Sequence, residues 1–388
     1  METGDNQRSA ARLSELAWLF LKLGATAFGG PAAHVAMMDD EVVRRGRWLT
    51  REEFLDLLGA TNLIPGPNST EMAIHIGRRR AGWPGLLFAG AAFILPAALL
   101  TMGIGWLYLS AGTLPRVQGI LYGIKPVILV VVVQALWALA RSALKTRFLA
   151  AVAVAALAAS FGGVHELVLL LAAGLVVAAG RGCLRPGANF AVLGGLTIAQ
   201  ASAAAATAAA GGVPFGAWPL FLFFLKVGSV LFGSGYVLLA FLRADLVERF
   251  GWLTDSQLLD AVAVGQMTPG PVFTTATFVG YVLGGPWTAV VATLGIFAPA
   301  FVFVALSGPL IPRLRRSRLA GAILDGVNAA SLALMAAVTL RLAPAALIDW
   351  PAALIALAAA FLLFRLRINS AWLVAGGAIA GAVLSAVR

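Results

Sequence analysis

A lysine precedes a glycine-rich segment in each half of this chain, inside stretches that are otherwise apolar. Lys22 comes before the Phe-Gly-Gly-Pro of residues 28–31, and Lys226 comes before the Phe-Gly-Ser-Gly of residues 232–235. Glycine clusters let an apolar helix break and expose backbone N–H groups, while a lysine at membrane depth costs at least about 2.5–3.5 kcal/mol on insertion scales. The motifs therefore predict ammonium groups beside free N–H donors, which would bind an anion. A lysine that snorkels to the membrane interface is the alternative, but its recurrence at the same distance from both breaks favours a shared function.

The sequence Pro-Gly-Pro also occurs once in each half, at residues 65–67 and 269–271. Each proline removes an N–H donor and clashes with the preceding helical turn, so neither segment can lie inside a continuous helix. At membrane depth such a break is tolerated only where it lines a cavity or is buried in protein. The residues that follow begin a half-helix, whose free N–H groups and positive dipole end form an anion site. A plain kink or hinge is the alternative.

Together these motifs give the candidate substrate-binding residues. In the first half they are Lys22, Gly29, Gly30, Asn62, Pro65, Gly66, Pro67, Asn68, Ser69 and Thr70. In the second half they are Lys226, Gly233, Ser234, Gln266, Pro269, Gly270, Pro271 and Thr274. We expect the two lysines to meet near the axis that relates the halves and to compensate the charge of a tetrahedral dianion, which the amide, hydroxyl and backbone groups would hydrogen-bond.

Two further patterns have local interpretations. Thr50 with Glu53, and Thr254 with Gln257, match the capping box, in which the threonine oxygen and the acid or amide satisfy backbone N–H groups at a helix start. These residues predict helix starts, not site residues. Glu71 follows the first break and has no acidic counterpart in the second half. It either couples protons to transport or caps the helix N-terminus.

The remaining ionisable residues predict no catalysis. Asp56 and Asp260 recur before the breaks and are expected to pair with the lysines or with surface arginines. His34, His75 and His165 have no counterparts in the second half and are expected at the membrane interface rather than as ligands. Because we find no metal-ligand spacing, no glycine-rich nucleotide loop and no nucleophile–base set, the sequence predicts no catalytic residue, no metal, no cofactor and no enzyme activity.

These motifs belong to an internal repeat. Residues 20–67 align without gaps with residues 224–271, 204 positions later, and 17 of the 48 aligned pairs are identical. In an apolar chain, such a repeat is typical of a secondary transporter built from two related halves around a central site.

Composition sets the fold class. The chain is 60% hydrophobic and only 12% charged, with a mean hydropathy of +0.91, and its long uncharged stretches can cross a bilayer as helices. We therefore predict an all-α polytopic membrane protein with about 12–13 transmembrane segments, arranged as two inverted-topology repeats with broken helices. The expected parts are a first repeat at residues 1–185, a linking transmembrane span at 186–214 and a second repeat at 215–388.

The positions of Lys and Arg predict the inversion. The net charge of +11 does not indicate nucleic acid, because the basic residues form short clusters between apolar spans, as the positive-inside rule requires. In the first half the basic loop is at residues 78–80, whereas the corresponding loop at 281–286 has no Lys or Arg. The next loop has only Arg116 in the first half but four arginines at 313–318 in the second. The arginines at 44–51 fit this scheme less well.

The motifs at residues 28–31, 48–50 and 65–67, with their second-half partners, resemble those of the chromate ion transporter family in its long-chain, two-domain form. The similarity covers nearly the whole chain, and the combination of motifs is specific. The resemblance implies chromate export across a prokaryotic plasma membrane and chromate resistance. The second half departs from the first at Ser234-Gly235 and lacks a cluster like that at 78–80, which argues against equal binding by both halves.

Energetics agree with an exporter of oxyanions. A dianion that leaves an inside-negative cell gains about 2.3 kcal/mol per charge per 100 mV, so roughly 4.6 kcal/mol in all. A carrier of sulfate or another oxyanion is the alternative within transport. A membrane scaffold subunit without substrate is the alternative class, but it would not need a twice-repeated lysine and broken helix. The expected partners are chromate or a sulfate-like oxyanion and the lipid bilayer, not nucleic acid, and the sequence allows a homodimer.

Overall fold

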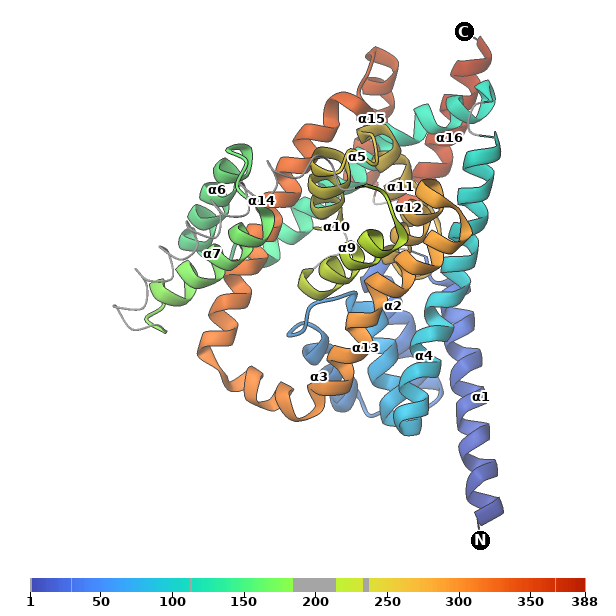
Figure 1. The fold of residues 1–388 in the computed structure, drawn as a ribbon, viewed down its shortest axis with the longest axis vertical. Helices are drawn as coiled ribbons and strands as arrows, with labels where there is room; N and C mark the ends of the chain where they lie inside the picture. Colours follow the sequence, from blue (N-terminus) through green and yellow to red (C-terminus); the bar gives the residue numbers. More distant parts are fainter. Residues whose placement is uncertain are drawn as a thin grey trace.

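The chain folds into helices that form two repeats. The computed structural model describes residues 2–28, 30–111, 114–183, 214–232, 237–366 and 368–387, and within these ranges the regular structure is helical (Figure 1). The first repeat contains α1 (Glu2–Thr26), α2 (Gly30–Asp39), the π-helical segment η1 (Asp40–Arg45), α3 (Arg51–Thr61), α4 (Asn68–Ala111), α5 (Pro115–Ala143), α6 (Arg147–Phe161) and α7 (Glu166–Gly180). The second repeat contains α9 (Ala217–Val230), α10 (Leu238–Phe241), the π-helical segment η3 (Leu242–Arg249), α11 (Asp255–Met267), the 3-10 turn η4 (Val272–Thr274), α12 (Thr275–Gly284), α13 (Pro286–Arg316), α14 (Arg318–Ala346), α15 (Trp350–Arg365) and α16 (Ser370–Val387). Most of the predicted linking span at 186–214 lies outside the described residues.

Side-chain caps begin equivalent helices in both repeats. The two predicted capping boxes are confirmed, with Thr50 at the start of α3 and Thr254 at the start of α11. A second pair of caps was not predicted: Thr146 accepts a hydrogen bond from the first turn of α6, and Asp349 does the same for α15. Each cap satisfies an N–H group that the helix itself leaves unpaired.

The Pro-Gly-Pro segments divide the stretches of the chain at residues 53–77 and 257–281. In the first repeat α3 ends at Thr61 and α4 begins at Asn68, and in the second α11 ends at Met267 and α12 begins at Thr275. Soon after each break the chain reverses direction, at residues 81–82 inside α4 and at Gly285 between α12 and α13. Small residues permit the reversal, because a Cβ added to Gly77 would overlap the backbone of Gly85.

Each repeat packs its last helices on the other repeat. The helices α15 and α16 pack on α5, while α6 and α7 pack on α14. Where α5 crosses α16, a Cβ added to Gly123 would overlap the backbone of Gly377. Where α14 crosses α7, a Cβ added to Gly326 would overlap the backbone of Ala173 and Gly174. Glycines at such crossings let helix backbones approach closely in lipid, where packing rather than water drives association. The halves are therefore interlocked.

The equivalent helices α5 and α14 lie antiparallel. Lys125 in the first half of α5 shares a cavity with Ala346 at the end of α14. At the other end of the pair, Ala143 at the end of α5 shares a second cavity with Asn328 in the first half of α14. Because equivalent helices run in opposite directions, the repeats are inverted, as the swapped basic loops predict.

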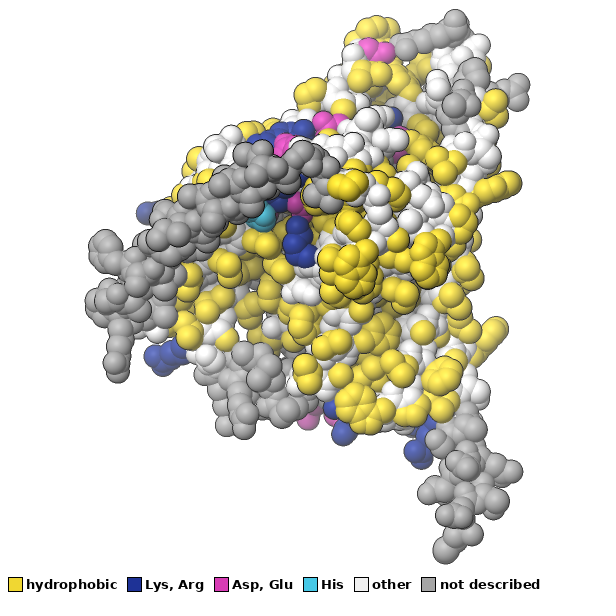
Figure 2. All heavy atoms as spheres, viewed as in Figure 1, with side chains coloured by type: hydrophobic (Ala, Val, Ile, Leu, Met, Phe, Trp, Pro, Cys, Tyr) yellow, Lys and Arg dark blue, Asp and Glu magenta, His cyan; other side chains and the backbone are white. Residues whose placement is uncertain are grey.

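The surface and the helix lengths suit a bilayer. Among the described residues, four helical elements contain a stretch that is long and apolar enough to cross a membrane. They are Asn68–Ala111, which includes the reversal at 81–82, Val117–Ala143, Pro286–Ser307 and Arg318–Ala346, and six shorter apolar helices accompany them. Large apolar side chains such as Trp106, Trp137 and Leu294 are exposed, and hydrophobic side chains are spread over much of the face seen in Figure 2. This confirms the predicted class of polytopic helical membrane protein.

Several basic clusters meet at one end of the molecule, called here the basic end. Lys145 after α5 and Arg181 after α7 both pair with Asp325 near the start of α14, at 3.3 Å and 2.8 Å. Arg78 donates hydrogen bonds to carbonyl groups at Val304 and Ala305 of α13, the helix that leads into α14. By the positive-inside rule this end faces the cytoplasm.

The arginines at 44–51 also belong to the basic end, although they fitted the predicted scheme of basic loops less well than the other clusters. Arg79 pairs with Glu53 of α3 at 2.7 Å, and the Arg80 guanidinium lies 4.8 Å from the ring centroid of Trp48. These contacts join the segment around α3 to the cluster at 78–80, so its arginines follow the same charge bias as the other cytoplasmic loops.

Candidate functional site

The two Pro-Gly-Pro breaks are hydrogen-bonded to the broken first helices of the opposite repeats. The Gly66 N–H donates to the Leu231 carbonyl at 2.8 Å, and the Gly270 N–H donates to the Ala27 carbonyl at 2.9 Å. Leu231 is the residue just after α9, and Ala27 is the residue just after α1. The two bonds are equivalent under the internal repeat, so the four breaks meet in one crossed arrangement.

Only glycine fits the centre of each break. Gly66 has a φ of 136° and Gly270 a φ of 84°, values at which a side chain is strained. A Cβ on Gly270 would also lie 2.8 Å from the Gly24 carbonyl oxygen and 2.8 Å from the Cβ of Ala97. The second break is thus packed directly against α1 and α4 of the first repeat.

At the basic end, a cavity of about 430 Å³ adjoins the first break. Asn62 and Asn68 form its wall on the side of the break, where the Asn68 amide donates to the Asn62 side-chain oxygen at 2.9 Å. The facing wall comes from α5 and α14 and offers the polar side chains of Ser142, Asn328 and Ser331. Amide and hydroxyl groups of this kind hydrogen-bond oxyanions without adding charge.

The charges around the basic-end cavity favour an anion. Lys145 and Asp325 line it, and Arg181 pairs with Asp325 from outside its wall. Among the described residues of this group, two cations therefore face one carboxylate. The break contributes the N-terminus of α4 at Asn68, whose free N–H groups and dipole add partial positive charge.

A second cavity, of about 520 Å³, lies at the opposite end of the α5–α14 pair. Lys125 pairs there with Asp260 at 3.3 Å, and the Tyr108 hydroxyl donates to the same carboxylate at 3.0 Å. Tyr122, also in the wall, donates to the carboxylate of Asp349. Lys125 and Asp260 line this cavity, and Asp349 is bonded to Tyr122 from outside its lining. This described group thus has one ammonium and two carboxylates, the reverse of the balance at the basic end.

The two cavities occupy equivalent places in the repeats. The helices α5 and α14 have the same length, 29 residues, and aligning them pairs residues of one cavity with residues of the other. In each pair the first residue comes from α5 or the segment just after it, and the second from α14 or the segment just after it. The pairs are Tyr122/Asp325, Lys125/Asn328, Ser142/Ala345, Ala143/Ala346 and Lys145/Ile348. The inverted repeat therefore builds one vestibule at each end, and the side chains differ between them.

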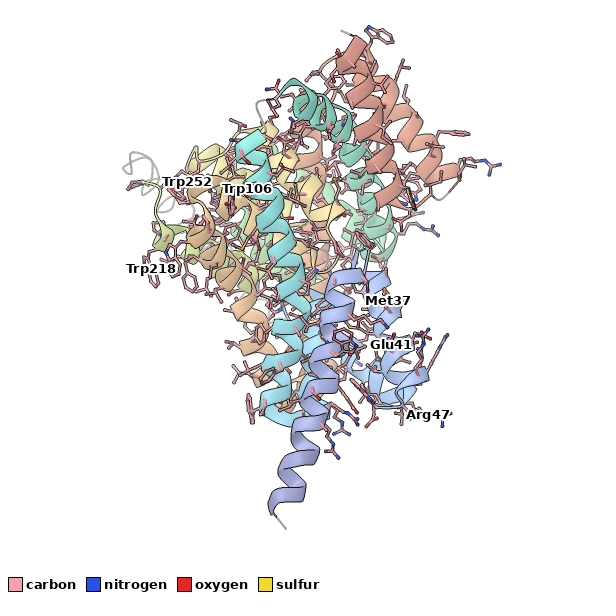
Figure 3. The ribbon with its side chains drawn as sticks, turned by 90° about the vertical axis from the view of Figure 1, so that its right-hand side faces the viewer. Met37, Glu41, Arg47, Trp106, Trp218 and Trp252 are labelled. Carbon is pink, nitrogen blue, oxygen red and sulfur yellow. The ribbon has the colours of Figure 1, made fainter. Side chains whose placement is uncertain are left out.

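The two repeated lysines pair with acids of their own repeats. Lys22 lies 3.0 Å from Glu41 of η1, and its side chain is 48% exposed. Lys226 pairs with Asp245 of η3, which is the residue equivalent to Glu41, and its side chain is 32% exposed. Figure 3 shows Glu41 well apart from Trp252, which lies three residues beyond the end of η3 in the second repeat. The lysines thus belong to two separate ionic clusters.

Equivalent positions form ion pairs in both clusters, but at several of them an acid in one repeat is replaced by a base in the other. In the first repeat Asp39 pairs with Arg44 and Arg51. In the second repeat the equivalent residue is Arg243, which pairs with an acid in each equivalent position, Glu248 and Asp255. Since the pairing survives a complete exchange of sign, its function is to fold η1 and η3 against the neighbouring helices.

Comparison with known proteins identifies the family. The chromate transporter family profile matches this chain twice, over residues 14–178 and 218–382. The chain belongs to the chromate transporter family. It is 32% identical over 388 residues to the chromate transport protein of Cupriavidus metallidurans, covering 96% of this chain and 93% of that protein. It is 36% identical over 331 residues to the chromate transport protein of Pseudomonas aeruginosa (84% and 79%) and 29% identical over 384 residues to the probable chromate transport protein of Synechococcus elongatus (96% of each). No solved structure was found to match the chain.

Membership of the chromate transporter family, together with the apolar helices, makes the chain a multi-pass membrane protein, consistent with a prokaryotic inner membrane. The two matched segments coincide with the two structural repeats. Within the described ranges, no group of three or more His, Cys, Asp and Glu side chains is placed to hold a metal ion.

The structure brings only part of the predicted site together. Asn62 and Asn68 line the basic-end cavity, and Pro65, Gly66 and Pro67 form the break beside it. Ser69 and Thr70 are buried in the first turn of α4. In the second repeat Pro269, Gly270 and Pro271 form the other break, and the Thr274 hydroxyl donates to the Pro271 carbonyl at 2.9 Å. Gln266 is half-buried near the end of α11, Gly30 begins α2, and Gly29, Gly233 and Ser234 lie outside the described residues.

Two expectations about single residues were wrong. His34 and His75 are 1% and 6% exposed, so they are buried rather than interfacial, and His34 is hydrogen-bonded to the Ala27 carbonyl at the crossing. Asp260 pairs with Lys125 and Tyr108 rather than with a repeated lysine or a surface arginine. The partners of Asp260 come from α5 and α4, which the local sequence does not reveal.

Sequence reasoning missed the residues of α5 and α14. Lys125 and Asp325 each stand inside an apolar stretch, at 117–140 and 320–342, and an intramembrane charge by itself indicates a functional position. That signal was present in the sequence. Asn328 and Ser331 gave no comparable signal, because uncharged polar residues are common at helix contacts.

Proposed function

We propose that this protein exports chromate from the cytoplasm and that the dianion first binds in the basic-end cavity. The observation that carries the proposal is the cavity itself, which combines an excess of cations with neutral donors and adjoins a half-helix N-terminus. The relatives from Cupriavidus metallidurans and Pseudomonas aeruginosa are chromate transport proteins by name. A volume of about 430 Å³ leaves room for a tetrahedral dianion with part of its water shell.

Asn62, Asn68, Asn328 and Ser331 are the hydrogen-bonding groups in this proposal. They face the cavity from the break on one side and from α14 on the other, so the dianion would bridge the two elements. Ser69 and Thr70 follow in the first turn of α4, where backbone N–H groups are free. Lys22 and Lys226 set the positions of η1 and η3 through Glu41 and Asp245, and they reach the substrate only if those pairs open.

Two physical asymmetries favour export over import. The membrane potential of an inside-negative cell drives a dianion outward with roughly 4.6 kcal/mol per 100 mV. The excess of cations at the basic end attracts an anion from the cytoplasm, while the two carboxylates at the opposite cavity favour its release. The protein acts as a carrier in this proposal and not as an enzyme.

The test is the flux of radiolabelled chromate into inverted membrane vesicles under an imposed potential. We expect uptake that rises with a positive potential inside the vesicle, because that interior corresponds to the outside of the cell. N328A should reduce uptake at low chromate concentration, whereas T339V, which alters a buried hydroxyl bonded to its own helix at Met335, is the matched control. Unlabelled sulfate as a competitor measures selectivity. Uptake equal to that of vesicles without the protein would refute the proposal.

A further inference from the structure

Glu71 is a fully buried carboxyl group beside the first break. Its side chain is 0% exposed, and within the described structure neither of its oxygen atoms has a hydrogen-bond partner. It lies against the crossing, because a Cβ added to Gly66 would overlap Oε1 of Glu71. The neighbouring cluster is apolar and includes Ile64, Ile74 and Ala300. A carboxylate in such surroundings is costly unless it is paired or protonated.

Glu71 also stands in the first turn of α4, one turn after Asn68, which lines the basic-end cavity. The N-terminus of this helix therefore serves two negative groups, the Glu71 carboxylate and a bound dianion. When both are charged they repel each other, as two carboxylates do when they share a site. A dianion at the break thus favours the protonated form of Glu71, and its departure favours the ionised form.

We infer that Glu71 takes up one proton together with the dianion and carries it in the same direction, so that each transport cycle moves one net negative charge. The inference rests on the function proposed above and adds the coupling ion. It also leaves export favourable, because the potential of an inside-negative cell still drives a net charge of −1 outward.

A path for the proton leads toward the basic end. His75 lies one turn beyond Glu71 on the same helix, is buried, and has an Nε2 atom without a hydrogen-bond partner in the described structure. Arg78 follows near the helix end and donates to the carbonyl groups of Val304 and Ala305 on α13. The charged groups that other helices place around this path are Glu53 of α3, which pairs with Arg79, Glu15 of α1, which pairs with Arg80, and Lys145 and Asp325 at the cavity.

Only the first repeat carries these groups. The residue aligned with Glu71 is Thr275, whose hydroxyl donates to the Val272 carbonyl at 2.8 Å, and the second repeat has no histidine. The repeat conserves the breaks, the caps and the ion pairs, but it does not conserve the acid. One acid therefore sets the stoichiometry at one proton per dianion.

The experiment measures the potential at which net chromate flux stops in proteoliposomes with a tenfold chromate gradient and equal pH on both sides. Valinomycin and graded potassium set the potential. Transport of the dianion alone stops at about 30 mV, whereas transport of the dianion with one proton stops at about 59 mV, because a tenfold ratio corresponds to 29.6 mV for two charges and 59 mV for one. We expect about 59 mV for the wild type, with a further shift of about 59 mV for each unit of pH difference.

E71Q provides the decisive comparison, and T275V at the equivalent position is its matched control. E71Q should stop at about 30 mV with no dependence on the pH difference, while T275V should behave as the wild type. Wild-type flux that stops at about 30 mV at every pH overturns the inference and leaves the proposed function intact. An E71Q protein that keeps about 59 mV also overturns it, because another group then carries the proton. Absence of wild-type flux contradicts the proposed function itself. The wild-type measurement can overturn the inference by itself even if E71Q does not fold.

Discussion

The charge of the basic-end cavity can be changed in either direction by single substitutions. D325N removes the carboxylate that Lys145 and Arg181 share, and K145M removes one of the two cations. The side chains of Lys145 and Arg181 are 63% and 38% exposed, so neither substitution leaves a buried charge without a partner. We expect D325N to lower the KM for chromate and K145M to raise it.

The size of the effect follows from the size of the cavity. A sphere of 430 Å³ is about 9 Å across. A dianion at its centre would therefore lie about 7 Å from the carboxylate carbon of Asp325. At that distance the dianion and the carboxylate repel each other by about 1.2 kcal/mol at the dielectric constant of water, and by about 5 kcal/mol at an effective dielectric constant of 20. The exposure of Lys145 argues for the lower figure. It corresponds to an approximately eightfold decrease in KM for D325N, and K145M should produce an increase of similar size.

The assay is initial chromate flux against concentration at a fixed potential. The double variant K145M/D325N should return close to the wild-type KM, because it restores the original sum of charges. The reasoning fails if D325N raises the KM, or if all three variants stay within about twofold of the wild type, since about 1.2 kcal/mol predicts a clear separation.

Three further predictions concern the scaffold. D39R alone should lower the stability in detergent by about 2 kcal/mol, a value between those for exposed and buried ion pairs. The triple variant D39R/R44E/R51D should recover most of the lost stability, because the second repeat has that arrangement of charges. No recovery would contradict the structural role of these pairs. G270A should abolish transport because its φ of 84° is unsuitable for alanine, and normal flux would show that transport does not depend on the geometry of this break. T50A should cost about 1 kcal/mol through the lost cap of α3 without changing the preference for chromate over sulfate, which competition flux would measure.

Local patterns predicted the elements well. The capping box at Thr50 and the break at Pro65–Pro67 depend on residues within a few positions of each other, so their geometry follows from the sequence itself. The inverted arrangement was also predictable, because the distribution of arginines between loops records which side each loop faces. In these cases the physical cause acts over a short range of sequence or on a whole loop.

Contacts between distant segments were not predictable in this way. The hydrogen bond from Gly66 to Leu231 joins one repeat to the other, and no local pattern specifies it. The lysines illustrate the same limit, because Lys22 was expected near the axis but pairs with Glu41 in η1. One signal in the sequence did point to such pairing: the residue equivalent to Glu41 in the second repeat is again an acid.

The comparison of the two repeats separates structural from functional positions. Where a residue only holds the fold, the repeats preserve the contact, even when the signs are exchanged as at Asp39 and Arg243. Where the cavities differ, the contact itself has changed: Lys125 faces Asp260 at one end, whereas the equivalent Asn328 offers an uncharged amide at the other. A symmetric pair of vestibules would bind an anion equally from both sides. The unequal charges make one vestibule more attractive to an anion than the other, and the membrane potential acts in the same direction, so the departures from symmetry are the positions at which mutation should alter transport rather than folding.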